Sequence, residues 1–138
     1  MSDQQSNCET GSSTSDTCCG AGAPTLIVAC SGGSNAGQVS NSIMVELDKK
    51  GAGKAYCLAG IGADLSGFVE SAKAARMVVI DGCPTGCARK ALGRYGIDAS
   101  QYFLVTELGI TKVHDFSRLS EETAIALKAV LEKMSSSR

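Results

Sequence analysis

Aromatic residues are scarce in this 138-residue sequence, which has no tryptophan, one histidine, three tyrosines and three phenylalanines. So few rings offer little for nucleic-acid bases to stack on. The formal net charge of −1 also provides no basic surface for phosphate groups. We therefore expect no nucleic-acid partner.

Long apolar runs are also missing. No stretch approaches the roughly 20 apolar residues that cross a bilayer, so we expect no membrane partner. The first residues, MSDQQSNCETGSS, lack the basic region and apolar core of a secretory signal. These absences favour a cytoplasmic protein, in a compartment where thiols stay reduced.

Cysteine is the residue that the sequence has in unusual number. There are seven, an odd total that argues against a complete set of disulfides. In a reducing compartment such residues are more often metal ligands or reactive thiols. The cysteines are therefore the main candidates for functional residues.

The N-terminal segment, residues 1–23, differs from the rest of the chain. It is rich in serine, threonine and glycine and contains no leucine, isoleucine, valine or aromatic residue. Such a segment buries too little apolar surface to offset the entropy of ordering it, so we expect a flexible tail. Its cysteines, among them the adjacent Cys18 and Cys19, are either accessory thiols that pass on a metal or exposed thiols with no defined role.

Apolar runs and helical periodicities alternate from Thr25 onward, and 43% hydrophobic residues suffice for a packed core. This alternation predicts one α/β domain over residues 24–138, with a mainly parallel sheet of about four strands and helices on its faces, in Rossmann- or flavodoxin-like layering. The sequence leaves the strand order open. The predicted strands are 25–29, 54–58, 76–80 and 102–106. Three predicted helices end near residues 50, 75 and 96, and a fourth begins near Ser120.

Three cysteines recur with the period of the strand–helix repeat. Cys30, Cys57 and Cys83 each follow a predicted strand, so all three belong to the carboxyl edge of the sheet, where open α/β folds bind ligands. Cys87 follows Cys83 at i+4 on a helix that we expect to begin at Pro84, with Cys83 as its N-cap. Together these four residues predict a tetrahedral Zn²⁺ site with four thiolate ligands.

The same residues allow two other kinds of chemistry. At a helix N-terminus the pKa of Cys83 would fall, and three bases further along the helix would add to the effect (Arg89, Lys90 and Arg94). Cys83 could then act as a nucleophile and Cys87 as the resolving thiol in thiol redox or sulfur transfer. Four thiolates also suit an iron–sulfur cluster. The sequence contains no CxxC motif, and each cysteine taken alone is equally consistent with a small buried hydrophobe.

Polar residues near these cysteines provide weaker candidates. The segment 31–37 follows a strand and opens a helix, which is the place for an anion-binding loop, although no Walker motif is present. His114 is either a ligand or base, or a surface residue. Asp81 either accepts hydrogen bonds beside the site or shapes the turn that follows it.

Three motifs resemble the signature blocks of the DGC-domain family, small proteins named for an Asp-Gly-Cys motif. The motifs are CSGGSNAGQ from Cys30, CLAGIG from Cys57 and DGCPTGC from Asp81, within a resemblance that spans about residues 25–120. The family is described as zinc-binding on account of four cysteines, and no enzymatic activity is established for it. The resemblance implies that Cys30, Cys57, Cys83 and Cys87 hold the metal.

Overall fold

The structure is a computed structural model and describes residues 22–137. Within them, four strands form one fully parallel sheet in the order β2-β1-β3-β4. The strands are β1 (Thr25–Ala29), β2 (Lys54–Ala55), β3 (Arg76–Asp81) and β4 (Gln101–Leu104). This arrangement confirms the predicted α/β class and supplies the strand order that the sequence left open.

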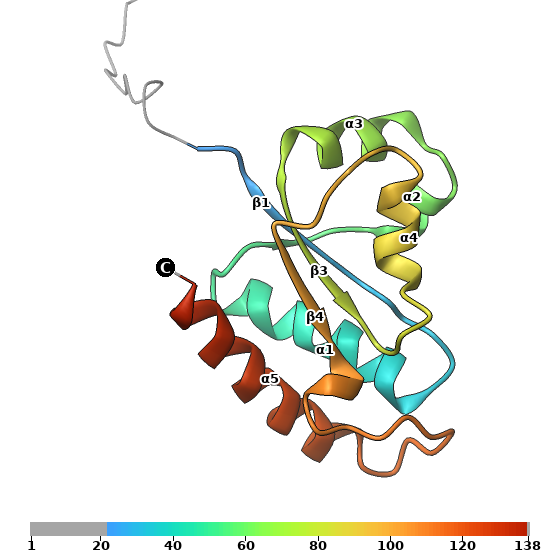
Figure 1. The fold of residues 1–138 in the computed structure, drawn as a ribbon, viewed down its shortest axis with the longest axis vertical. Helices are drawn as coiled ribbons and strands as arrows, with labels where there is room; N and C mark the ends of the chain where they lie inside the picture. Colours follow the sequence, from blue (N-terminus) through green and yellow to red (C-terminus); the bar gives the residue numbers. More distant parts are fainter. Residues whose placement is uncertain (1–21, 138) are drawn as a thin grey trace, which may run out of the picture.

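Helices connect the strands and cover both faces of the sheet (Figure 1). One face packs against α1 (Asn35–Lys49) and α5 (Leu119–Ser136), and the other packs against α2 (Leu58–Gly62), α3 (Ser66–Ala74) and α4 (Cys87–Gly93). A short 3₁₀ helix, η1 (Val105–Glu107), follows β4. None of these helices has the length and apolar character needed to cross a membrane.

The period-two alternation of a strand explains why the core has two parts. In β1, Ile27 and Ala29 face the layer of α1 and α5, whereas Val28 faces the layer of α2, α3 and α4. In β3, Val78 and Ile80 alternate with Val79 in the same way. Because both faces are covered, each central strand contains an unbroken apolar run, residues 26–29 in β1 and 77–80 in β3.

Several predicted boundaries were wrong by a few residues. β2 has two residues instead of the predicted run to Leu58, because the chain turns into α2 directly after Cys57. β4 ends at Leu104, where the backbone closes into η1. α5 begins at Leu119 with Arg118 at its N-cap, so Ser120 lies inside the helix and does not cap it.

The strand order places a topological switch point between β1 and β3. The chain leaves β1 through α1 toward β2 on one side, whereas it leaves β3 through α4 toward β4 on the other side. The two connections diverge and open a crevice at the carboxyl ends of the two strands. Ligands of open α/β sheets bind in such crevices.

Candidate functional site

A pocket of about 490 Å³ lies at this switch point, and three of the four predicted ligands line it. We call it the switch-point pocket. It is bounded by the loop after β1, the loop after β3 and the segment that precedes α5. Its lining residues are Cys30, Gly32, Gly33, Ser34, Gly37, Gly82, Cys83, Thr85, Cys87, Lys112, Val113 and His114.

Two glycines allow the backbone segments around the pocket to meet. A Cβ atom on Gly82 would lie 2.7 Å from the backbone nitrogen of Gly37, and one on Gly37 would lie 2.7 Å from that of Gly32. Real Cβ atoms do not come so close, so only glycine fits at these two positions. The end of β3 is thereby brought against the first turn of α1, and Cys83 lines the same pocket as Cys30.

Asp81 fixes the position of α4. Its side chain is 1% exposed, and its carboxylate accepts hydrogen bonds from the backbone N–H groups of Ala88 (2.8 Å) and Arg89 (3.1 Å). The Tyr102 hydroxyl donates a third, at 3.1 Å. Burial, followed by the charge and hydrogen bond of Asp81, raises the pKa of Tyr102 to about 12. The aspartate therefore supports the pocket by holding the first turn of the helix that carries Cys87.

The structure corrects the predicted start of this helix. α4 begins at Cys87, not Pro84, and its N-cap is Gly86, whose φ of 65° lies in the left-handed region. Cys83 therefore lies in the loop before the helix, and Cys83 and Cys87 do not share a helical face. Pro84 was the misleading signal, because it suits a turn as well as the first position of a helix.

Cys83 lies among groups that stabilise its thiolate. Its Sγ atom lies 3.4 Å from the Thr85 hydroxyl, and the Lys112 ammonium donates to Sγ at 3.3 Å. Hydrogen bonds from the Thr85 side chain and backbone lower the pKa of the Cys83 thiol, and the Lys112 hydrogen bond and charge lower it further. The helix N-terminus that we expected to activate this thiol is thus replaced by a threonine and a lysine.

The other two cysteines of the pocket differ in exposure. Cys30 is partly buried, and burial raises the pKa of its thiol, although backbone N–H groups of Gly32 and Gly82 act in the opposite direction. The charge of Cys87 raises it as well, so these two groups lie within electrostatic reach of each other. Cys87 itself is exposed at the start of α4. All three thiols are free.

Cys57 does not line the pocket. It is exposed, and as the N-cap of α2 its Sγ atom accepts a hydrogen bond from the Gly60 N–H at 3.4 Å. Within residues 22–137, no three histidine, cysteine, aspartate or glutamate side chains form a group that could hold a metal ion. The four-cysteine zinc site therefore stays a prediction.

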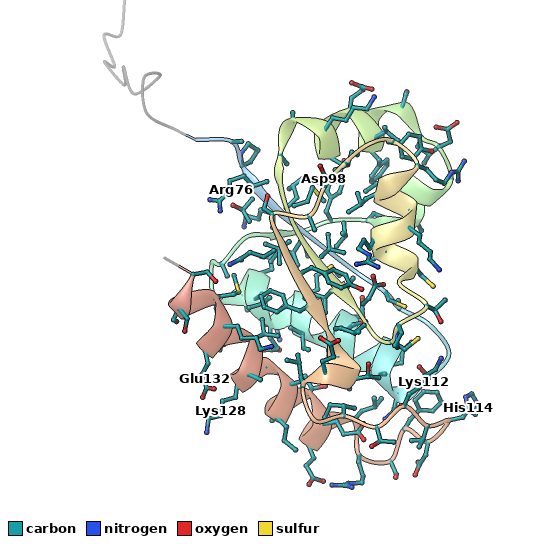
Figure 2. The ribbon with its side chains drawn as sticks, in the orientation of Figure 1. Arg76, Asp98, Lys112, His114, Lys128 and Glu132 are labelled. Carbon is teal, nitrogen blue, oxygen red and sulfur yellow. The ribbon has the colours of Figure 1, made fainter. Side chains whose placement is uncertain are left out.

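The remaining candidates take varied positions. His114 lies at the exposed rim of the pocket, where its Nδ1 is 2.7 Å from the Gly33 carbonyl oxygen (Figure 2). Arg89 and Arg94 lie over the rings of Tyr102 and Tyr95. Neither arginine lines the pocket, nor does Lys90. The tail cysteines, including Cys18 and Cys19, lie outside the described residues.

At the predicted anion-binding loop, N–H groups of the helix N-terminus already have hydrogen-bond acceptors within the protein. The backbone N–H of Asn35 donates to the Val113 carbonyl at 3.1 Å, and that of Gly37 donates to the Ser34 hydroxyl at 3.3 Å. The Gln38 side chain also donates to the Gly32 carbonyl. The hydrogen bonds of this segment therefore shape the pocket wall.

Lys112 and Thr85 are the pocket residues that sequence reasoning missed. Lys112 lies on the segment between η1 and α5, far along the chain from the cysteines (Figure 2). No spacing rule links it to Cys83, because its position depends on how that segment folds back onto α1. Thr85 lies inside the recognised DGCPTGC motif, where its position two residues after Cys83 was a usable signal.

Comparison with known proteins agrees with these motifs. The chain is 33% identical over 88 residues to the anaerobic and virulence modulator AnvM of Pseudomonas aeruginosa, an alignment that covers 63% of this chain and 67% of the relative. No solved structure matches significantly. Residues 26–130 match the DGC domain, so all four motif cysteines fall inside the match. The chain therefore belongs to the DGC domain family.

Proposed function

We propose that the switch-point pocket binds a thiophilic metal ion, Zn²⁺ by preference, through the thiolates of Cys30, Cys83 and Cys87. The observation that supports this proposal is the presence of these three free thiols around one pocket at the ligand-binding edge of the sheet. Thiolates are the ligands that soft and borderline ions prefer.

The chemistry of the donors fits such an ion, whereas a closed four-sulfur cage is not formed in advance. The three side chains line the pocket without forming a metal-binding group, so binding requires them to turn toward a common ion. Cys57 lies outside the pocket lining, which leaves three protein ligands and an open position. Sites with an open position are those at which zinc reacts or exchanges ligands.

The fold also argues against a purely structural metal. Small zinc domains need their ion because they lack a core, and they unfold without it. This domain has fully buried residues on both faces of its sheet, including Ile27, Val79 and Leu92. We therefore assign the metal to a carrier or sensing role and expect the domain to stay folded without it.

The test is the zinc content of the untagged full-length protein purified anaerobically, measured with its visible spectrum. We expect about one zinc per chain in the natural protein and in Cys57→Ser, and loss of zinc in Cys30→Ser, Cys83→Ser and Cys87→Ser. Equal loss in Cys57→Ser would restore the four-thiolate site. A colourless protein without zinc would overturn the metal proposal, and a brown one would indicate an iron–sulfur cluster instead.

A second candidate function is favoured by the contact of Lys112 with Cys83. A lysine ammonium at 3.3 Å stabilises a thiolate, which is the nucleophilic form of cysteine. In this scheme the Cys83 thiolate attacks a disulfide substrate and displaces one of its sulfurs as a thiolate. The Cys87 thiolate then attacks Cys83 and releases the second sulfur. The two cysteines end as a disulfide, and the substrate ends as two thiols.

One measurement separates this scheme from metal binding. A disulfide substrate such as oxidised glutathione should leave a Cys83–Cys87 disulfide in the metal-free protein, detectable by mass spectrometry after trypsin digestion. Cys87→Ser should stop the reaction at the mixed disulfide on Cys83, with Cys57→Ser as the unaffected control. If Cys57 forms the mixed disulfide as readily as Cys83, the scheme fails.

A further inference from the structure

Asn35 is a fully buried polar residue close to the switch-point pocket. It is the first residue of α1 and is 0% exposed, although it does not line the pocket. Burying an amide is costly unless its donors and acceptor are all paired. The partners of Asn35 therefore show what this amide holds in place.

Those partners flank Lys112 on both sides. The amide nitrogen of Asn35 donates to the Thr111 carbonyl at 2.9 Å, and the amide oxygen accepts from the Val113 N–H at 2.7 Å. The backbone N–H of Asn35 also donates to the Val113 carbonyl at 3.1 Å. Three hydrogen bonds from one residue thus fix the backbone immediately before and after Lys112.

A carboxylate from α5 completes the arrangement. The second hydrogen of the Asn35 amide points to Glu122, whose two oxygens lie 3.1 and 3.2 Å from the amide nitrogen. This contact orients the amide, because the nitrogen must then face Glu122 and Thr111 and the oxygen must face Val113. The start of α1, the start of α5 and the segment around Lys112 are thereby joined.

We propose that Asn35 is a positioning residue that holds Lys112 against Cys83 and so sets the reactivity of this thiol. The proposal rests on the proposed function, because it matters only if the thiolate of Cys83 binds or reacts. The proposal also gives Asn35, the asparagine of the CSGGSNAGQ motif, a role that does not involve phosphate binding. Asn35 acts through the lysine and does not itself reach the pocket.

The test is a double-mutant cycle on the full-length, metal-free protein. Iodoacetamide is added at one fixed pH, and the alkylation rate of each cysteine is measured by mass spectrometry, with Cys57 as the internal reference. Lys112→Met should slow Cys83 relative to Cys57 by up to about fivefold, the upper end for an exposed charge contact. Asn35→Asp should slow it about threefold, because a carboxylate has no donor for Thr111 and repels Glu122.

The combined variant decides the mechanism. If Asn35 acts through Lys112, Asn35→Asp has no further effect on Cys83 once Lys112 is methionine. A further threefold loss in that background would overturn the proposal, because it would mean a general loosening of the domain. Asn41→Asp, which adds the same charge to the same helix, is the matched control and should leave the ratio unchanged. If Asn35→Asp does not fold, Asn35→Ser completes the same cycle.

This experiment can fail independently of the metal proposal. Alkylation of the metal-free protein reports on the contact between Lys112 and Cys83 whether or not zinc binds. A protein with no zinc but with a non-additive cycle would retain the positioning role and lose the metal. Bound zinc with an additive cycle would support the metal proposal and overturn the positioning role of Asn35.

Discussion

Cys57 and Cys83 follow two parallel strands of the same sheet, yet only one of them lines the switch-point pocket. After β2 the chain turns at once into α2, and the Cys57 thiol becomes the cap of that helix. After β3 the segment 82–86 separates the strand from α4, and Cys83 contacts Thr85 and Lys112. Equal positions in a sequence repeat thus give two different chemical environments.

The strand order explains this difference. β1 and β3 are neighbours whose connections diverge, so the space beyond their ends stays open. β2 is an edge strand of two residues, and no strand lies beyond it in the described sheet. A thiol beyond β2 therefore has a neighbouring strand on one side only. The following predictions test whether the region around Cys57 and the region around the switch-point pocket are as different as their geometry indicates.

The largest effect is expected from Asp81→Ala. The substitution leaves two backbone N–H groups at the start of α4 and the Tyr102 hydroxyl without their shared acceptor. Losing a buried carboxylate with three donors should lower the free energy of unfolding by about 3 kcal/mol, measured by urea denaturation. The pocket thiols should lose their distinct alkylation rates, whereas Cys57 keeps its own.

Asp64→Asn is a milder comparison for this change, at an exposed carboxylate. Asp64 also accepts a hydrogen bond from a tyrosine hydroxyl, that of Tyr95 at 2.8 Å, but it is exposed and follows α2, the helix that Cys57 caps. Asparagine tolerates its positive φ of 59° and keeps an acceptor for the tyrosine. We expect a change within about 0.5 kcal/mol. A loss from Asp64→Asn as large as that from Asp81→Ala would contradict the contrast between the exposed and the buried carboxylate.

A somewhat smaller effect is expected from Gly82→Ala. The added Cβ would lie 2.7 Å from the backbone nitrogen of Gly37, so β3 and α1 must move apart, at a cost of about 2 kcal/mol. Gly62 in α2 has nothing within 4 Å of the same added atom. Gly62→Ala should therefore stabilise the protein by roughly 0.5 kcal/mol through helix propensity. Thermal unfolding of the two variants measures both, and a tolerated Gly82→Ala would mean that the pocket walls are not in close contact.

The third prediction concerns pH. Because the pKa of Cys83 is lowered, its thiolate forms and its alkylation rate rises at a lower pH than for an ordinary cysteine. The pKa of Cys30 is raised by burial, so its rate rises only at higher pH. Lys112→Met should move the Cys83 profile toward higher pH and leave that of Cys30 in place. Coincident profiles for Cys30 and Cys83 in the natural metal-free protein would contradict this assignment.

The central strands and their parallel arrangement could be predicted from the sequence. Residues 26–29 and 77–80 are apolar without interruption, a pattern typical of a strand that is covered on both faces. The end of α1 was signalled by Lys49, Lys50 and Gly51. The sequence also assigns three cysteines to the sheet edge, because Cys30, Cys57 and Cys83 each follow a strand.

The details of the site could not be predicted, because they depend on contacts distant in sequence. The strand order decides that Cys30 and Cys83 share a pocket, and no periodicity encodes it. The start of α4 is set by Asp81, which binds its N–H groups from the preceding strand. Lys112 contacts Cys83 from a segment whose backbone is hydrogen-bonded to Asn35 on both sides of the lysine.

The smallest effect should come from cysteine-to-serine changes, and its sign should differ between the two regions. Cys57 is an exposed N-cap, and serine is a better acceptor at that position, so Cys57→Ser should stabilise the metal-free protein by up to about 0.5 kcal/mol. Cys30 is partly buried, and replacing its sulfur with a hydroxyl loses apolar contact, so Cys30→Ser should destabilise it by about 0.5–1 kcal/mol. Urea denaturation of the two variants in parallel resolves the difference. Equal losses would contradict the assignment of Cys57 as an exposed cap that the domain does not bury.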